Sequence, residues 1–301
     1  MRLDIEALRV LDVVIQEGSF AKAANRLHKA QSAISYQIKK LEDQLDVTIF
    51  DRSSYRAELT PKGKALWIEG KRLLEQAARI EKLADHYSEG WEPNFDLVID
   101  ASLPMEPVMK AMKVLVDREI PTKIQVKVEA MRGVQKRFEQ DQAHMMLVKD
   151  YQPGPHLKAV PLPQITFVLV AARDHALASL HNIDLNHLLE HVELTIHDSS
   201  ETSTDSLDEH QFGGDRVFYM HGFMSKKAGL MMGLGFGWMP DFLIADELAA
   251  GTLVELDYEG GSRSSFTPLL VYPTDQPLGK AGELILDEIL SEFEQFKQNV
   301  Q

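Results

Sequence analysis

The sequence predicts a mainly α-helical head, one long helix, and a larger α/β body of two lobes. Three observations support this prediction: apolar residues recur at helical spacing through the first ninety residues, strands alternate with helices from Phe95 onward, and the two parts differ in charge. Residues 1–90 contain 15 Lys and Arg against 14 Asp and Glu, whereas the remainder contains 17 against 32. A mildly basic head on a strongly acidic body is one indication of a nucleic-acid surface, although a charged face is often simply solvated.

Length and composition exclude several classes of protein. The 301 residues are enough for about two domains. Without cysteine there is no disulfide, thiolate nucleophile or Cys-ligated zinc. No segment approaches the roughly 18 apolar residues of a membrane helix, and the acidic start, residues 1–6, differs from a signal peptide. We therefore expect a cytoplasmic chain without a cofactor.

Three helices are expected in the head. The first should end at Gly18, Ser19 should cap the second, and residues 28–30 should form the turn before the third. The apolar positions of the third helix are Ile34, Ile38, Leu41 and Leu45. Two short helices joined by so tight a turn indicate a helix-turn-helix, although the corner of an ordinary three-helix bundle has the same spacing.

A polar hairpin is expected after the third helix. Residues 48–50 and 57–59 bracket a Ser-rich segment that contains Arg52 and Arg56. A hairpin in this position is a wing, whose arginines reach phosphates or the minor groove. Side chains suited to base edges and phosphates lie on the exposed face of the third helix: Gln31, Ser32, Ser35, Tyr36, Lys39 and Lys40. Residues 1–60 are therefore predicted to form a winged helix-turn-helix.

Residues 61–90 are predicted to form one long linker helix. Thr60 is its cap and Pro61 its first residue. Large residues repeat every seven positions, with small residues four later: Leu66, Leu73, Ile80 and Tyr87, then Gly70, Ala77 and Ala84. Such a seam packs either on its own domain or on a second copy of the helix. Its place between head and body favours a dimer seam.

The body is expected to have two α/β lobes, residues 91–163 with 266–301, and residues 164–265. Strands of the first lobe are predicted at 95–100, 123–130, 145–148 and 268–272, with helices at 105–116, 135–140 and 278–296. Strands of the second are predicted at 165–171, 192–196, 217–220 and 236–239, with a helix at 223–232. The first three strands of the first lobe alternate with helices in a βαβαβ pattern, which predicts a mainly parallel sheet there.

Small ligands bind such folds at the carboxyl ends of strands, beside helix N-termini. Ser102 follows the first strand, and residues 195–200 end a strand of the second lobe. These hydroxyl groups are candidate ligand contacts, although Ser102 and Ser199 are equally placed to be helix caps.

The head resembles the LysR-type transcriptional regulators. The resemblance lies in residues 17–24, 31–42, 50–52 with Arg56, and 59–63, and the order of elements in the body agrees with it. It implies DNA contacts at Gln31, Ser32, Ser35, Tyr36, Arg52 and Arg56. One departure is Tyr36, where the family most often has an arginine, so the base preference should differ from the usual one.

The resemblance also implies an effector cleft between the lobes, in an architecture like that of periplasmic binding proteins. The candidate effector-binding residues are Ser102, Met131, Arg132, His197, Ser199, Ser200 and His221. Arg132 is a possible carboxylate anchor or an exposed arginine, and each histidine is a ligand contact or an ordinary solvated or core residue. A second departure is residues 141–144, where the family usually has Gly then Asp. The family further implies a homodimer, and a tetramer through contacts between bodies.

The sequence motifs that would indicate an enzyme are absent or incomplete. The glycines at 233, 235 and 237 follow a helix and precede a strand, the reverse of a dinucleotide-binding loop. His187 and His191 stand four apart, but no third metal ligand has supporting spacing. The sequence thus predicts a regulator that binds double-stranded DNA and is switched by a small-molecule effector. The alternatives are a cytoplasmic small-molecule-binding protein and an enzyme that uses the two-lobed body.

Overall fold

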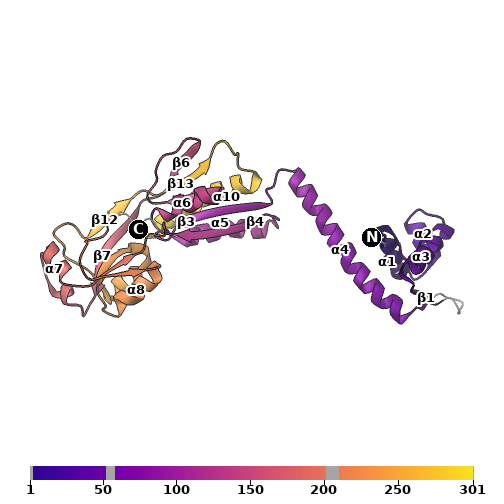
Figure 1. The fold of residues 1–301 in the computed structure, drawn as a ribbon, viewed down its shortest axis with the longest axis horizontal. Coiled ribbons are helices and arrows are strands. Elements are labelled where there is room, and N and C mark those ends of the chain that lie inside the picture. Colours follow the sequence, from indigo (N-terminus) through magenta and orange to yellow (C-terminus); the bar gives the residue numbers. More distant parts are fainter. Residues whose placement is uncertain (1–2, 52–57, 201–209, 301) are drawn as a thin grey trace. The chain divides into compact units, whose positions relative to one another are not determined.

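The computed structural model describes residues 3–51, 58–200 and 210–300 (Figure 1). The chain divides into two compact units, Met1–Glu89 and Gly90–Gln301, and each is described by itself. Within the described residues, no helix combines the length and hydrophobicity that a bilayer-spanning segment needs.

The head contains three short helices, α1 (Ile5–Glu17), α2 (Phe20–Arg26) and α3 (Gln31–Leu45). As predicted, α1 ends at Gly18, whose φ of 63° lies in the left-handed region and whose N–H donates to the carbonyl of Ile15. Ser19 is the N-cap residue of α2, but its side chain makes no capping hydrogen bond. The predicted turn at residues 28–30 is closed by backbone bonds from His28 to Asn25 and from Lys29 to Ala24.

The three helices pack around one small hydrophobic core. Its fully buried members include Leu11, Ile34, Ile38, Leu41 and Ile49. The buried carboxylate of Glu42 accepts hydrogen bonds from the backbone N–H groups of Ile49 and Phe50, at 2.7 and 3.0 Å. This bond ties the end of α3 to the two-stranded hairpin β1 (Phe50–Asp51) and β2 (Glu58–Leu59). The head is therefore a helix-turn-helix followed by a hairpin.

The long helix α4 (Pro61–Ser88) begins as predicted, because the Thr60 hydroxyl accepts a hydrogen bond from the N–H of Gly63 at 2.9 Å. Its amino-terminal half packs on α1. Gly70 is buried against Leu8, and the indole N–H of Trp67 donates to the Asp12 carboxylate at 2.8 Å. The helix thus extends from the core of its own head.

The first lobe of the body has a five-stranded sheet in the order β4-β3-β5-β13-β6. The strands are β3 (Asn94–Asp100), β4 (Lys123–Glu129), β5 (Met145–Val148), β6 (Leu157–Pro161) and β13 (Leu269–Pro273). The first three are parallel, and β13 runs antiparallel to both β5 and β6. Helices α5 (Met105–Asp117), α6 (Gly133–Gln140) and α10 (Lys280–Val300) complete this lobe. The sequence missed the edge strand β6.

The start of the body is tied to the start of its last helix. The Glu92 carboxylate accepts hydrogen bonds from the N–H groups of Ala281 and Gly282, at 2.8 and 2.9 Å. The N–H of Lys280 donates to the carbonyl of Gly90 at 3.1 Å. A carboxylate at a helix N-terminus satisfies N–H groups that lack an intrahelical partner.

The second lobe has a sheet in the order β11-β7-β10-β8-β9, with β12 also paired to β7. Its strands are β7 (Ile165–Ala172), β8 (Glu193–Ile196), β9 (Val217–Met220), β10 (Phe236–Pro240), β11 (Leu253–Glu255) and β12 (Arg263–Phe266). Its helices are α7 (Leu185–Leu189), α8 (Phe223–Met231) and α9 (Ala245–Ala250), with 3₁₀ turns at Ala176–Ser179 and Asp241–Leu243. The prediction for the glycine-rich segment is confirmed: Gly233, at φ 71°, ends α8, and β10 ends at Pro240.

Candidate nucleic-acid interface and inter-lobe cavity

The predicted reading face of α3 is largely open to solvent. Gln31, Ser32, Tyr36 and Lys39 are exposed, and Ser35 is half-buried. Tyr36 is 67% exposed, which is unusual for so large a ring. No acidic side chain lies in the first turn of α3, and its N-cap, Ala30, offers no capping oxygen. The first turn of the helix therefore presents polar groups and the positive end of the helix dipole with no carboxylate of its own.

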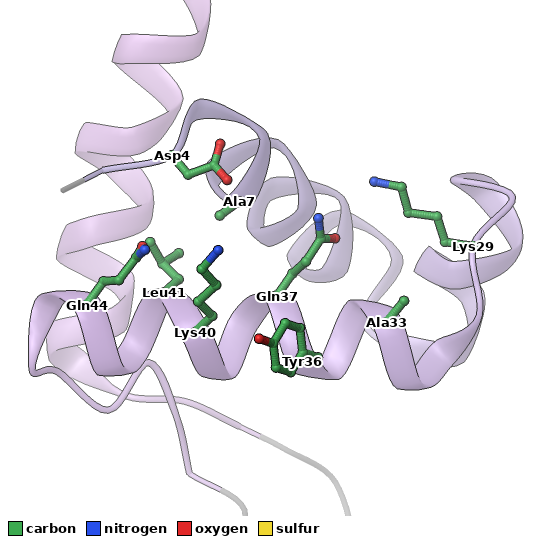
Figure 2. Close-up of a pocket in the computed structure, with 9 residues that line it drawn as sticks. All are labelled: Asp4, Ala7, Lys29, Ala33, Tyr36, Gln37, Lys40, Leu41 and Gln44. Atoms are coloured by element: carbon green, nitrogen blue, oxygen red, sulfur yellow. The ribbon is translucent and has the colours of Figure 1, made fainter. Parts of the chain in front are cut away.

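A groove of about 470 Å³ runs along the side of α3 that faces the start of α1 (Figure 2). Figure 2 shows Gln37 and Lys40 rising from α3 toward Asp4 and Ala7. At its other end the Lys29 ammonium pairs with the Glu6 carboxylate at 2.9 Å. Cationic and hydrogen-bonding side chains thus flank Tyr36 on a single helix face.

The two predicted wing arginines, Arg52 and Arg56, lie outside the described residues. The strands that bracket them are present, with Phe50 opposite Leu59 and Asp51 opposite Glu58.

The predicted seam of α4 is only partly free, which corrects the sequence interpretation. Leu66 packs on the core of its own head, and Gly70 is covered by Leu8. Leu73, Ile80 and Tyr87 are 38%, 60% and 40% exposed. The first heptad therefore belongs to the head, because Gly70 is small enough for α1 to approach, and only the later heptads present an apolar face.

In the body, a small cavity of about 30 Å³ lies where the two lobes meet. Its wall combines ionisable and aromatic side chains from both lobes: Asp100, Ser102, Met131 and Lys149 from the first, and Phe167, Thr195, Ile196, His210, Phe223, Lys226 and Trp238 from the second. Of the predicted effector residues, Ser102 and Met131 line this cavity.

Asp100 ends strand β3 and is buried at the cavity wall. Its Oδ1 accepts the Ser102 hydroxyl at 2.6 Å and the Ser102 N–H at 2.8 Å. Burial raises the pKa of Asp100 to about 6, and the bonds from Ser102 offset part of that rise. Since the N-cap of α5 is Pro104, the alternative interpretation of Ser102 as a helix cap is wrong.

Two lysines and a histidine of the wall are also shielded from water: the Lys149 side chain is 6% exposed, and His210 and Lys226 are 7% and 3% exposed. The Lys149 ammonium lies 3.2 Å from Nδ1 of His210 and 5.9 Å from the centroid of the Phe167 ring. The Lys226 ammonium lies 5.9 Å from the centroid of Phe223. Aromatic faces stabilise cations that are removed from water, so both lysines have a partial replacement for their hydration.

The second-lobe loop after β8 joins the lobes. The Ser199 hydroxyl accepts from the N–H of Ala130 at 2.9 Å and donates to its carbonyl at 3.1 Å. The Ser200 carbonyl accepts from the Lys136 ammonium. Arg132 pairs with Asp198 at 3.3 Å. Ser199 is therefore an inter-lobe contact, not a helix cap, and Arg132 has a carboxylate of the protein itself as its partner.

The predicted histidines lie elsewhere. His197 and His221 are exposed and contact each other, with ring centroids 5.9 Å apart, outside the cavity wall. His187 bonds the cap residue Asp184 of α7, whereas His191 lies beyond that helix. Among the described residues, no group of three or more metal-binding side chains is placed to hold a metal ion.

Sequence reasoning missed the main ionisable groups of the cavity, Asp100, Lys149, His210 and Lys226. A usable signal existed for two of them, because Asp100 ends β3 and Lys149 directly follows the neighbouring parallel strand β5. The carboxyl ends of adjacent parallel strands meet at one edge of a sheet. No comparable signal marks His210 or Lys226.

A helix-turn-helix head joined to a two-lobed α/β body with a polar cavity defines a class of ligand-responsive DNA-binding proteins. The bacterial regulatory helix-turn-helix model of the lysR family matches residues 5–64, and the LysR substrate binding domain model matches residues 96–294. The probable HTH-type transcriptional regulator YhaJ of Escherichia coli K12 is 28% identical over 296 residues, which cover 95% of this chain and 96% of that protein.

Two solved structures share the fold. The OxyR C206 mutant of Corynebacterium glutamicum superposes with a TM-score of 0.59 at 17% identity, covering 99% of this chain and 94% of that one. Full-length LysG of the same organism, with bound effector Arg, gives 0.53 at 17% identity, covering 97% and 99%.

The chain belongs to the LysR family of bacterial regulators. It is a DNA-binding transcriptional regulator with an effector-binding domain, and the two alternative classes, an enzyme and a stand-alone small-molecule-binding protein, are set aside. Regulators of this family bind DNA and small-molecule effectors and form oligomers.

Proposed function

We propose that residues 1–60 bind an operator, that residues 61–90 pair two chains, and that the body switches them. In this proposal lobe I comprises residues 91–163 and 266–301, and lobe II residues 164–265. The two separate sheets support this division, since each has its own hydrophobic core. Because the target is DNA, we place the protein in the cytoplasm.

The proposed DNA contacts divide into two kinds. Sequence preference comes from the amino-terminal part of α3, through Gln31, Ser32, Ser35 and Tyr36. Lys39, Arg52 and Arg56 hold phosphates or the minor groove. The exposure of the α3 side chains supports this assignment, because side chains that are already solvated and held on a helix reach the major groove without rearrangement of the core.

The proposed effector site is the inter-lobe cavity. The observation that carries this proposal is the set of buried polar side chains drawn from both lobes, Asp100, Ser102 and Lys226 among them. Burial of an ionisable group lowers the stability of the fold, so several such groups at one cavity indicate a binding function. A ligand held by both lobes favours one arrangement of the lobes over another, which is what a switch requires.

We assign the other predicted effector residues to the rim and hinge of this site. Ser199, Ser200 and Arg132 form contacts between the lobes, and an effector that changes the lobe arrangement acts on them. His197 and His221 are the outermost members and are proposed as peripheral contacts. Pairing of two α4 helices through Leu73, Ile80 and Tyr87 makes the dimer, and contacts between bodies make a tetramer.

Arg52→Ala tests the DNA interface. We expect about tenfold weaker binding to every sequence and a salt dependence shallower by about one counterion, because one phosphate contact is lost. Fluorescence anisotropy on DNA upstream of the protein's own gene, across a salt series, measures both. Arg118→Ala, at an exposed site of the body, is the matched control. If neither the affinity nor its dependence on salt changes, the hairpin does not contribute to the DNA interface.

Ser102→Ala tests the effector site. Loss of the hydroxyl that holds Asp100 should weaken effector binding about fivefold and blunt the transcriptional response, while operator affinity stays near that of the parent. An effector found by thermal-shift screening of the full chain, calorimetry and a reporter assay provide the readouts. Ser225→Ala, exposed on α8, is the control. Full effector affinity in Ser102→Ala would place the sensing site elsewhere.

A further inference from the structure

Some buried polar atoms that line the inter-lobe cavity have no hydrogen-bond partner among the described residues, and we consider two of them that lie in different lobes. One is Oδ2 of Asp100, at the end of β3 in lobe I, and the other is Nε1 of Trp238, on β10 in lobe II. Asp100 is 4% and Trp238 6% exposed, and both residues line the cavity. Because unpaired buried polar groups are rare in native proteins, each needs an explanation.

The two atoms have opposite hydrogen-bonding characters. The ionised Asp100 oxygen only accepts, and the indole N–H only donates. The Ser102 hydroxyl does not satisfy Oδ2, since its proton is already directed to Oδ1 at 2.6 Å. A molecule that satisfies both atoms must therefore carry a donor and an acceptor, and a hydroxyl group is both.

The rest of the wall favours a flat, apolar body for that molecule. The rings of Phe167, Phe223 and Trp238 and the side chains of Met131 and Ile196 surround the polar groups. The centroids of Phe167 and Phe223 are 5.8 Å apart, with the rings tilted. Such walls bury an aromatic or alicyclic ring by dispersion and by the hydrophobic effect.

The charges of the wall argue against a carboxylate ligand. Lys149 lies 4.0 Å from the Asp150 carboxylate, and both Asp150 and Lys149 act electrostatically on Asp100. Lys226 interacts with the buried carboxylate of Glu193. The two cations are thus matched by carboxylates of the protein, and an anionic ligand would add a negative charge beside Asp100 in a poorly solvated site.

Resting on the effector site proposed above, we propose that the cavity binds an uncharged, hydroxyl-bearing ring compound that donates to Asp100 and accepts from Trp238. The present volume of about 30 Å³ holds the polar end of such a molecule but not its ring. Met131 is half-buried at the cavity wall, and its unbranched thioether chain is the part of the wall that moves most easily. The ring takes the space that Met131 gives up.

Phenol, benzoate and toluene are probes of similar size that separate the alternatives, and calorimetry on the full chain at neutral pH measures their binding. We expect phenol to bind about tenfold more tightly than either of the others, since only phenol meets both buried groups without added charge. Asp100→Asn and Trp238→Phe should each weaken phenol binding about tenfold and leave toluene binding unchanged. Met131→Ala should strengthen phenol binding by enlarging the cavity.

Asp246→Asn, at an exposed position of α9, is the matched control and should behave as the parent. The unfolding temperature of each variant without ligand shows that it is folded. Benzoate binding that exceeds phenol binding and is lost in Trp238→Phe would overturn the ligand class while leaving the proposed site in place. Phenol binding that none of the three cavity variants changes would overturn both. Failure of all three probes to bind would overturn the ligand class.

Discussion

The two candidate binding surfaces treat their polar side chains in opposite ways. On α3, Tyr36 and its polar neighbours are solvated in the folded chain, so in the proposed interface they would lose water only on binding DNA. In the body, Asp100, Ser102 and Lys226 are desolvated as soon as the chain folds. A surface for a large partner can stay hydrated until binding, because the many phosphate charges of DNA supply enough contacts to offset the loss of that water. A cavity for a small molecule must hold its polar groups in place before binding. The few contacts that a small ligand makes cannot offset a large entropy cost of ordering those groups.

Charge sharpens the same contrast. The part of the chain after residue 90 contains 17 basic and 32 acidic residues, whereas the head is nearly balanced. DNA repels the strongly acidic body more than the nearly neutral head, and this difference favours approach of the head to the duplex.

The largest effect should come from Leu73→Asp in the exposed part of the α4 seam. In the proposed dimer, a charge placed in that interface would separate the two chains, and a single head would then bind its half-site without the gain of the second. We expect operator affinity to fall by about 100-fold or more, measured by anisotropy together with light scattering. Ile68→Asp on the same helix, where Ile68 is 41% exposed but off the seam, is the control. An unchanged oligomer in Leu73→Asp would rule out this seam.

The next effect concerns the buried carboxylate of Asp100. Its pKa is about 6 in the folded chain and 3.8 in its ordinary state, so folding favours the protonated form. The contribution of Asp100 to the free energy of unfolding therefore decreases as the pH rises from about 4 to above 6, and the two pKa values correspond to about 3 kcal/mol.

Asp100→Asn lacks this titration. Relative to the parent, the variant should gain up to about 3 kcal/mol between pH 4 and pH 7, measured by denaturant unfolding of the body at both pH values. Asp246→Asn, exposed on α9, should show no such gain. Parallel pH profiles of Asp100→Asn and the parent would mean that Asp100 is solvated, and the contrast between the two surfaces would disappear.

The smallest effect should come from Ser199→Ala. The hydroxyl bonds both the N–H and the carbonyl of Ala130 across the lobes, and its loss leaves a partly buried N–H without a partner. We expect the unfolding free energy of the body to decrease by about 1 kcal/mol, with Ser225→Ala as the neutral control. A decrease no larger than that of the control would show that the lobes hold together without this bond.

The sequence predicted those features that local chemistry determines. Thr60 and Pro61 begin α4, Gly18 ends α1, and the alternating or continuous apolar runs form the central strands of both sheets. Strands β6, β11 and β12 were not predicted, because they are short and pair at or near sheet edges. There, alternate residues need not be buried, so the apolar alternation that marks a strand is weak.

The cavity was only half predictable. Ser102 and Met131 follow strand ends, which is a sequence signal, and both line the cavity. Lys149 and Lys226 look like ordinary solvated lysines until packing buries them, and burial of a lysine is a property of the tertiary fold. The heptad pattern of α4 is continuous in sequence, yet its first repeat packs on α1, where Leu8 lies against Gly70. Periodicity identifies an apolar face but not the partner that covers it.

The ties at the start of the body have a mechanical consequence. Gly90 and Glu92 are bonded to the first residues of α10, a helix of lobe I, so the point where the chain enters the body is fixed to that lobe. Among the described residues of lobe II, none hydrogen-bonds to Gly90 or Glu92. A change in the arrangement of the lobes would therefore reach the entry point through lobe I. Loss of the Glu92 hydrogen bonds should leave ligand binding unchanged. It should let the start of α10 fray, so that a movement of lobe I is transmitted less well to the entry point.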